Sequence, residues 1–316
     1  MRYPGMGIFC YFCSRMEKIY KFSGAGNDFV VLDGREADVS AYRQPERIGA
    51  LCKQYKTDGL MILGTDPETD FCMEYYNPDG SGGMMCGNGG RCIVAFADML
   101  GLVPASGACL FRAPDGLHTA TILSRPPANV SGRETSAGES QWIVRLKMID
   151  VQGIAAAKGG YFLNTGTRHL VRFVADVDGI DIEKEGPVLR WDKEFAPEGT
   201  NVNFVQPTPE GLKVRTFEKG VEGETLACGT GLTASAIAAY CKGIPASQTS
   251  PLGAERHRGS GGLGPQSVED TVALQTIRYR LQCRRGDWLS VDFLPGENSF
   301  TEVYLTGPAE CVRTSY

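Results

Sequence analysis

The sequence predicts a mixed, strand-rich α/β fold made of two homologous domains that face each other. Its 316 residues are twice the usual length of about 150 residues for one domain. Short alternating segments outnumber segments with helical spacing. A Cys-Gly-x-Gly motif that opens a helical segment occurs once in each half of the chain. The 40 glycines show no period, which favours a turn-rich globular chain and excludes collagen.

Composition and charge exclude several classes of protein. The formal net charge is −5, so the chain lacks the basic surface of a nucleic-acid or anionic-membrane partner. No segment approaches the ~20 apolar residues of a membrane span, and no secretory signal is recognisable, so we expect a cytoplasmic protein. Eleven scattered cysteines predict reduced thiols, and three histidines are too few for a histidine-rich metal site. We therefore expect no bound metal.

The first half of the chain is predicted to be mostly β-structure. Residues 1–15 form an expected N-terminal tail, and 124–140, rich in Pro, Ser and Gly, an exposed loop. Apolar residues at helical spacing predict helices over 45–55 and 92–100. Alternating apolar and polar residues predict strands over 16–22, 29–33, 59–63, 70–76, 109–112, 118–123 and 141–148.

The second half repeats this organisation with one further insertion. A run of small residues predicts a helix over 233–240. Glycine, proline and serine dominate 246–268, which we interpret as an insertion. Alternation predicts strands over 160–163, 169–174, 201–206 and 213–217, and a further set within 271–303 that turns at Gly286-Asp287.

An internal repeat relates the two halves. Cys86-Gly87-Asn88-Gly89 and Cys228-Gly229-Thr230-Gly231 each begin a helix, about half the chain apart. Each motif follows a strand that ends in an aromatic and then a polar residue, Tyr76-Asn77 in one half and Phe217-Glu218 in the other. The ordered correspondence favours duplication of one domain.

The repeated motif indicates a pair of reactive thiols. A thiol at a helix N-terminus meets unpaired N–H groups and the positive end of the helix dipole, which lower its pKa. Glycines let those amides approach a carboxylate. A lone cysteine is usually a small core residue, but the repeated context favours chemistry at Cys86 and Cys228. Two opposed thiols suit inversion at a carbon, where one removes the α-proton and the other donates from the opposite face.

At these residues the sequence resembles the diaminopimelate epimerases, a family of amino-acid epimerases that use no cofactor. The resemblance spans roughly residues 16–303. Related proline racemases carry a histidine after the first Cys-Gly, where this chain has Asn88. The matching segments are Phe22–Phe29, Asn77–Ser81, Met85–Cys92, Asn201–Phe204, Glu218–Gly220 and Glu224–Gly231.

The resemblance implies two pseudo-symmetric domains, each a curved sheet or barrel around a central helix, with the active site in the cleft between them. We expect the domains over 16–134 and 135–316, with a final strand near 300–312 that packs back on the first. The implied reaction converts LL-2,6-diaminopimelate to meso-diaminopimelate in lysine and peptidoglycan precursor biosynthesis. It is an isomerase reaction on a small molecule, without pyridoxal phosphate or another cofactor. A homodimer is the candidate assembly.

The resemblance also implies roles for individual residues. Cys86 and Cys228 match the acid/base pair, His169 is expected to assist Cys86, and Glu218 to assist Cys228. The expected substrate-binding residues are Asn27, Asn77, Gly87, Asn88, Thr167, Asn201, Glu218, Lys219, Gly229 and Thr230.

Two departures from the family pattern bear on the identity of the substrate. The family usually has Gly-Asn-Pro-His where this chain has Gly166-Thr167-Arg168-His169, and Thr167 lacks the paired donor and acceptor of an amide. Lys219 replaces the family's arginine, which keeps the charge but loses the bidentate fork. The distal carboxylate of diaminopimelate is the expected ligand of that position.

Two alternatives to the epimerisation of diaminopimelate therefore stay open. The chain is then either a cofactor-independent epimerase of a different amino acid or a non-catalytic paralogue that binds an amino acid.

Overall fold

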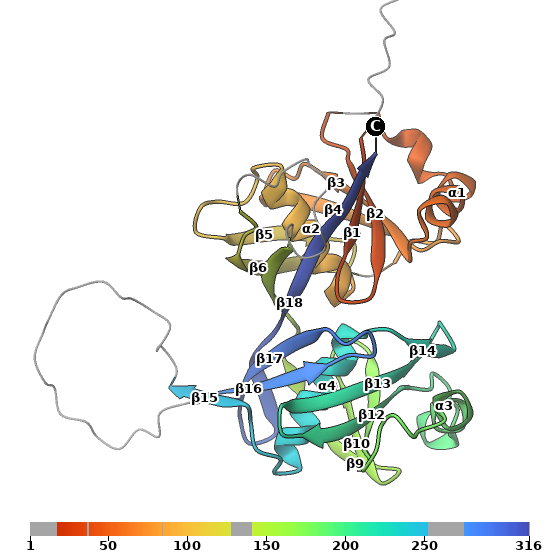
Figure 1. Ribbon diagram of the computed structural model, residues 1–316, viewed down its shortest axis with the longest axis vertical. Coiled ribbons are helices and arrows are strands. Elements are labelled where there is room, and N and C mark those ends of the chain that lie inside the picture. The colour runs from red at the N-terminus through yellow and green to blue at the C-terminus, as the bar shows by residue number, and fades with distance from the viewer. Residues whose placement is uncertain (1–17, 37, 84, 128–140, 252–274, 316) are drawn as a thin grey trace, which may run out of the picture.

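The computed structural model describes residues 18–36, 38–83, 85–127, 141–251 and 275–315. Figure 1 shows two lobes stacked along the longest axis, each with a sheet that curves around one helix. Strands far outnumber helices, and the prediction of a strand-rich α/β fold is confirmed. None of the described helices is long and apolar enough to cross a membrane.

The first lobe is a closed barrel around helix α2 (Gly87–Met99). Each strand from β1 to β7 pairs with the next, and β18 closes the ring by pairing with both β7 and β1. Helix α1 (Pro45–Tyr55) and the 3-10 helix η1 (Ser40–Arg43) lie outside the barrel. The strands are β1 (Ile19–Ser23), β2 (Asp28–Asp33), β3 (Gly59–Gly64), β4 (Phe71–Tyr76), β5 (Ala108–Ala113), β6 (Gly116–Ser124), β7 (Gln141–Lys147) and β18 (Ser299–Ser315).

The second lobe wraps a sheet around helix α4 (Gly229–Cys241). The pairing runs from β18 through β17, β16, β13, β12, β11 and β10 to β9, and β8 pairs with β18. Helix α3 (Ile182–Arg190) and the 3-10 helix η2 (Lys193–Phe195) lie outside. The strands are β8 (Val151–Gln152), β9 (Ala155–Ala157), β10 (Gly160–Asn164), β11 (Arg168–Phe173), β12 (Asn201–Thr208), β13 (Gly211–Glu218), β14 (Gly223–Thr225), β15 (Gln248–Pro251), β16 (Gln275–Gln282) and β17 (Trp288–Pro295).

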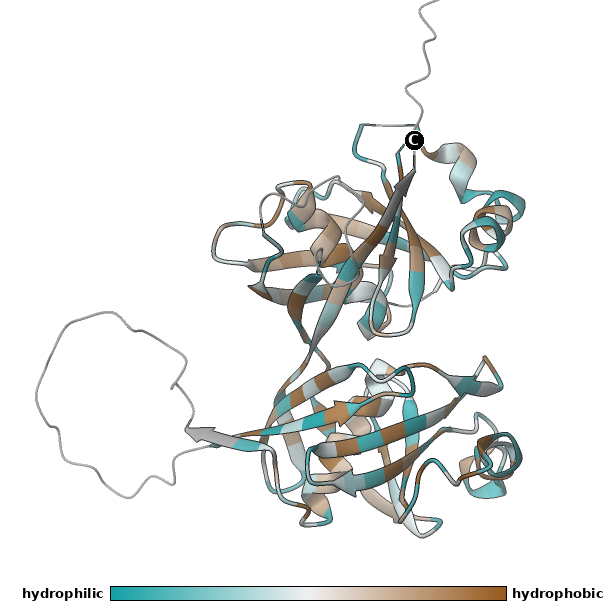
Figure 2. Ribbon diagram, in the orientation of Figure 1, coloured by the Kyte–Doolittle hydropathy of each residue, from teal (hydrophilic) through white to brown (hydrophobic). Residues whose placement is uncertain are grey.

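The two central helices are the cores of the lobes. The side chains of α2 and α4 are buried almost throughout, and Figure 2 shows apolar residues on these helices and alternating along the strands. Helix α4 consists of apolar and small residues on all sides, as expected of a helix inside a protein. Small residues such as Ala234, Ala236 and Ala238 let α4 fit within its sheet. In the first lobe Phe96 of α2 packs against Tyr20 and Phe22 of β1.

Helix α3 was not predicted from the sequence. Its interior holds Gly186 and Pro187, which disfavour a helix, so the local pattern is weak. Packing explains why the helix forms: a Cβ at Gly186 would lie 2.5 Å from the ring of Phe217, so only glycine permits this close approach. Ile182 is buried against the same sheet. Tertiary contacts therefore override local propensity here.

The predicted insertion over 246–268 needs a correction. Residues 248–251 form β15, which pairs antiparallel with β16. The rest of that segment from 252 onward lies outside the described residues, as do the predicted tail 1–15 and most of the loop 124–140. Strand β18 corresponds to the expected final strand near 300–312 and continues to Ser315.

Arg91 ties three parts of the first lobe together. Its side chain is completely buried, and its guanidinium donates to Gly87 O (3.0 Å), Gly24 O (3.2 Å), Asn88 Oδ1 (3.0 Å) and Pro308 O (3.2 Å). These acceptors belong to the first turn of α2, the β1–β2 turn and β18. One side chain therefore fixes the start of α2 against the strand that closes the barrel.

We expect Arg91→Met to lower the free energy of unfolding by about 3 kcal/mol, because several buried acceptors lose their donor. Urea unfolding followed by tryptophan fluorescence measures the change. Arg47→Met, on the exposed face of α1, is the matched control and should change stability by less than about 0.5 kcal/mol. Equal midpoints for the two variants would contradict the role given to Arg91.

Candidate active site

The two repeated cysteines occupy equivalent places in the two lobes. Cys86 immediately precedes α2 and Cys228 immediately precedes α4, both with extended backbone. The helix starts meet, because a Cβ built on Gly87 would lie 3.7 Å from the Cα of Gly229. Leu305 of β18 packs against both glycines. The unpaired first-turn amides of both helices therefore converge on one region.

Burial dominates the acid–base behaviour of both thiols. Desolvation raises the pKa of Cys86, reinforced by the Glu218 charge. The Gly89 N–H, which donates to Cys86 Sγ at 3.2 Å, and the charge of Arg91 oppose this rise. Desolvation also raises the pKa of Cys228, reinforced by the nearby Glu218 carboxylate and opposed by the Thr230 hydroxyl. The sequence predicted lowered pKa values from the helix dipoles. In the structure, burial outweighs that effect.

Asn88 links the two lobes beside the thiols. Its Nδ2 donates to Asn27 Oδ1 (2.5 Å) and to the carbonyl of Ala227 in the second lobe (3.2 Å), while its Oδ1 accepts from Arg91. The side chain is thus fully engaged by the protein. Only the backbone N–H of Asn88 remains suited to a substrate carboxylate, as at Gly87.

Asn77 lies at the end of β4, where its Nδ2 donates to Ser81 Oγ at 3.0 Å. It is half-buried, and the neighbouring Gly83 approaches it closely. The loop that follows leads directly to Cys86. Asn77 therefore stabilises the loop that connects β4 to Cys86.

Glu218, Lys219 and Asn201 form a second group beside Cys228. Desolvation raises the pKa of Glu218, opposed by hydrogen bonds with Thr225 and Cys228. Asn201 accepts from the Lys219 backbone N–H at 2.7 Å and donates to the carbonyl of Arg168 at 2.9 Å. The Lys219 side chain is exposed. Lys219 therefore presents an exposed positive charge beside Asn201 and Glu218.

His169 is completely buried on β11. Burial lowers its pKa to about 3, so the imidazole is neutral near pH 7. Its Nε2 lies 2.9 Å from Thr167 Oγ1 and its Nδ1 lies 3.0 Å from Asn203 Nδ2. The sequence prediction set His169 beside Cys86, whereas these contacts run through Thr167 toward Thr230 and Cys228.

Arg168 does not point its charge into this group. Its guanidinium donates to Glu198 Oε2 at 3.1 Å and stacks over the ring of Phe162. It therefore stabilises the outer side of β11, and Lys219 is left as the cation beside Asn201 and Glu218.

Two residues near the thiols were not predicted from the sequence. Tyr75, two positions before Asn77 on β4, lies within electrostatic reach of Cys86 and Glu218, and burial raises its pKa. Its position on the same face of the strand as Asn77 is the signal that could have found it. Arg91 is the other, and it lies four residues into the helix that Cys86 begins.

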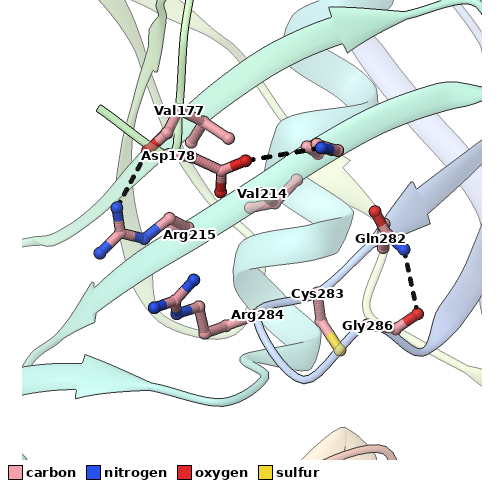
Figure 3. A pocket seen from close by; sticks show the side chains of 9 residues that line it. Val177, Asp178, Val214, Arg215, Gln282, Cys283, Arg284 and Gly286 are labelled. Carbon is pink, nitrogen blue, oxygen red and sulfur yellow. Dashed lines mark hydrogen bonds and ion pairs between the residues drawn. The ribbon is translucent and has the colours of Figure 1, made fainter. Parts of the chain in front are cut away.

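A cavity of about 100 Å³ lies apart from these residues, along β13 and the β16–β17 turn (Figure 3). Its charged lining groups pair with one another or with neighbours: Lys213 with Asp178 at 3.5 Å, and Arg215 and Arg284 with Glu224. None of the candidate site residues lines it. In the described part of the chain, no cluster of three or more His, Cys, Asp or Glu is arranged to hold a metal.

The buried neutral state of His169 makes stability depend on pH. The unfolded chain takes up a proton below about pH 6.5, whereas folded His169 does so only near pH 3, so its contribution to stability is lost as pH falls through this window. Compared with wild type, His169→Gln should flatten the dependence of unfolding free energy on pH by up to about 1.4 kcal/mol per unit between about pH 4 and 6. Chemical denaturation at several pH values measures this slope.

The matched control is Leu117→Gln on β6, an exposed position whose side chain does not titrate, and it should keep the wild-type slope. An unchanged slope in His169→Gln would show that this imidazole is not held neutral by the fold.

Comparison with known proteins identifies the family. The family model described as diaminopimelate epimerase matches residues 19–130 and 161–252. The diaminopimelate epimerase of Flavobacterium psychrophilum is 36% identical over 299 residues, which cover 93% of this chain and 98% of that protein. The diaminopimelate epimerase of Aquifex aeolicus is 38% identical over 239 residues, covering 72% of this chain and 82% of that protein.

Solved structures share the fold at much lower identity. A phenazine biosynthesis protein of the PhzF family from Bacillus anthracis superposes with a TM-score of 0.63 at 12% identity, covering 95% of this chain and 98% of that one. A hydroxyproline epimerase from Agrobacterium vitis gives a TM-score of 0.55 at 13% identity, covering 96% and 92%. An identity of 36–38% over 72–93% of the chain to diaminopimelate epimerases, together with the family match, gives the conclusion: the chain belongs to the diaminopimelate epimerase family.

Proposed function

We propose that the chain epimerises LL-2,6-diaminopimelate to meso-diaminopimelate, with Cys86 and Cys228 as the two acid/base groups. The observation that carries the proposal is the meeting of two helix starts, each directly preceded by a cysteine, at Gly87 and Gly229. Membership of the family makes the protein an isomerase of amino-acid biosynthesis, here for lysine and peptidoglycan precursors. A cytoplasmic location and a homodimeric assembly stay predictions.

The reaction needs one thiolate and one thiol on opposite faces of the substrate α-carbon. The thiolate takes the α-proton, the electron pair stays on carbon, and the opposite thiol donates its proton to form the inverted centre. The reverse reaction exchanges the roles of Cys86 and Cys228. No cofactor enters this scheme, because both protons are carried by sulfur.

The carbanion is stabilised through the substrate α-carboxylate. The first-turn amides of Gly87, Asn88, Gly229 and Thr230 are the proposed donors, since helix N-termini bind carboxylates and the dipoles favour negative charge. Asn27 holds the Asn88 side chain in place by accepting a hydrogen bond from Asn88 Nδ2. Asn77 is proposed to bind a polar group of the substrate from the first lobe.

The surroundings of the two thiols support a division of protonation states. Glu218 raises the pKa of both thiols, and Cys86 in addition has an amide donor and a nearby guanidinium, which favour its thiolate. Cys228 lies beside Glu218, which favours a protonated thiol. We assign Glu218 as the group that assists Cys228, and we place Lys219, with Asn201, at the distal carboxylate.

Single substitutions of the two thiols test the mechanism. In deuterated water, wild-type protein should add deuterium to one α-carbon of LL-diaminopimelate while it forms the meso isomer. Cys86→Ala and Cys228→Ala should each lose at least about 100-fold of the epimerisation rate, the usual contribution of a positioned acid or base. Chiral chromatography with mass spectrometry follows both readouts.

The matched control is Cys72→Ala, a half-buried cysteine on β4 that bonds the carbonyl of Thr65. It should keep the wild-type rate. Wild-type epimerisation in both Cys86→Ala and Cys228→Ala would refute the two-thiol mechanism, and tight binding of diaminopimelate without α-proton exchange would favour the non-catalytic alternative.

An epimerase of a different amino acid is the second candidate, favoured by Lys219 and Thr167 in place of the family's residues. If Lys219 binds the distal carboxylate, Lys219→Met should raise KM for diaminopimelate about tenfold with a smaller change in kcat, and Lys219→Arg should restore it. Lys213→Met, whose partner is Asp178, is the matched control. Strong turnover of a monocarboxylic amino acid by wild type, without turnover of diaminopimelate, would favour the second candidate.

A further inference from the structure

The hydroxyl of Thr167 lies at the centre of a chain of polar groups that connects His169 to Cys228. Thr167 Oγ1 is 2.9 Å from His169 Nε2, 3.3 Å from Asn201 Nδ2 and 3.3 Å from Thr230 Oγ1. Thr230 Oγ1 is in turn 3.4 Å from Cys228 Sγ. The sequence has a threonine at this position, where the family pattern usually has asparagine.

Counting donors fixes the direction of the first link. Asn203 donates from Nδ2 to the carbonyl of Leu170 (3.2 Å), and its Oδ1 accepts from the Thr216 hydroxyl (2.9 Å). This orientation makes Asn203 Nδ2 a donor to His169 Nδ1 as well. A neutral imidazole with an accepting Nδ1 carries its hydrogen on Nε2. His169 therefore donates to Thr167.

The same count fixes the remaining links. A hydroxyl has one hydrogen and two acceptor sites. Thr167 Oγ1 accepts from His169 and from Asn201 Nδ2, so its own hydrogen is directed to Thr230 Oγ1. Thr230 accepts there and keeps its hydrogen for Cys228 Sγ. The hydroxyl of Thr165, which donates to the carbonyl of Thr230 at 2.9 Å, holds this residue in place.

The second thiol depends on this chain more than the first thiol does. Cys86 receives the Gly89 N–H as a capping hydrogen bond, whereas Cys228 has no such cap. The groups that face Cys228 are the Glu218 carboxylate, the Cys86 thiol, the Gly231 amide and the Thr230 hydroxyl. Glu218 disfavours a thiolate, so a directed hydroxyl donor has the opposite and compensating effect.

We propose that Thr167 is a positioning residue that orients Thr230 as a hydrogen-bond donor to Cys228 Sγ, using the fixed tautomer of buried His169. The proposal deepens the proposed function and rests on it, because it explains how Cys228 becomes a thiolate when it acts as the base. The Thr167 side chain is exposed at the site. Even so, both acceptor sites and the one hydrogen of its hydroxyl are used by protein groups.

Site-resolved alkylation tests the proposal without relying on epimerisation. The rate of iodoacetamide labelling at each cysteine, followed by mass spectrometry against pH, reports the thiolate fraction directly. Thr167→Val should move the midpoint for Cys228 up by about one pH unit, because the donor to the thiolate loses its orientation. Cys86 in the same sample is the internal control and should keep its midpoint. Thr167→Ser, which keeps the hydroxyl, should restore the Cys228 midpoint.

A folded Thr167→Val protein with an unchanged Cys228 midpoint would overturn the proposal, and so would equal shifts in the Val and Ser variants. If Thr167→Val does not fold, Thr230→Val breaks the same chain at its last link, and its Cys228 midpoint decides in the same way. The proposed function fails by a different result, namely wild-type epimerisation in Cys228→Ala. The two failures are therefore distinguishable.

Discussion

The close approach of two helix starts at Gly87 and Gly229 is the constraint on which the rest of the structure depends. A Cβ at Gly87 or Gly229 would lie within about 3.0 Å of Leu305 Cδ2 and in van der Waals contact with the opposite glycine backbone, so a larger residue at either position requires Leu305 to move. With the backbones in contact, the unpaired amides of both first turns face a shared region and the preceding cysteines flank it. Asn88, Ala227 and Arg91 complete the junction by hydrogen bonds. The close approach of the two glycines therefore brings Cys86 and Cys228 within electrostatic reach of each other.

Pseudo-symmetry of the backbone does not extend to the surroundings of the two sulfurs. The Glu218 carboxylate raises the pKa of both thiols, but only Cys86 is also influenced by the buried Arg91 cation, and only Cys228 by the Thr230 hydroxyl. A reversible reaction needs both sulfurs to alternate between thiol and thiolate, so neither environment can favour one form too strongly. The opposing influences at each sulfur, donor against burial and hydroxyl against carboxylate, are consistent with that demand.

Much of the architecture could be predicted from local patterns, because alternating strands and the repeated Cys-Gly-x-Gly motif are encoded within short segments. Helix α3 could not, since Gly186 and Pro187 oppose it and only the contact with Phe217 explains it. The positions of Cys86 and Cys228 at the starts of two helices could be predicted as well. The path from His169 to Thr230 could not, because it depends on the parallel register of β11 and β12, which sets His169 opposite Asn201. The direction of the thiol pKa shifts also depends on burial, which no short segment reveals.

Strand β18 has a consequence for the order in which the protein assembles. Its first part pairs with β17 in the second lobe, and its last part pairs with β1 and β7 in the first. A ribosome therefore delivers the closing strand of the first barrel only after the whole second lobe has been synthesised. Until then the edges of β1 and β7 stay unpaired, and open edges invite wrong partners during translation. The two lobes are consequently coupled in biogenesis, and the first cannot mature alone.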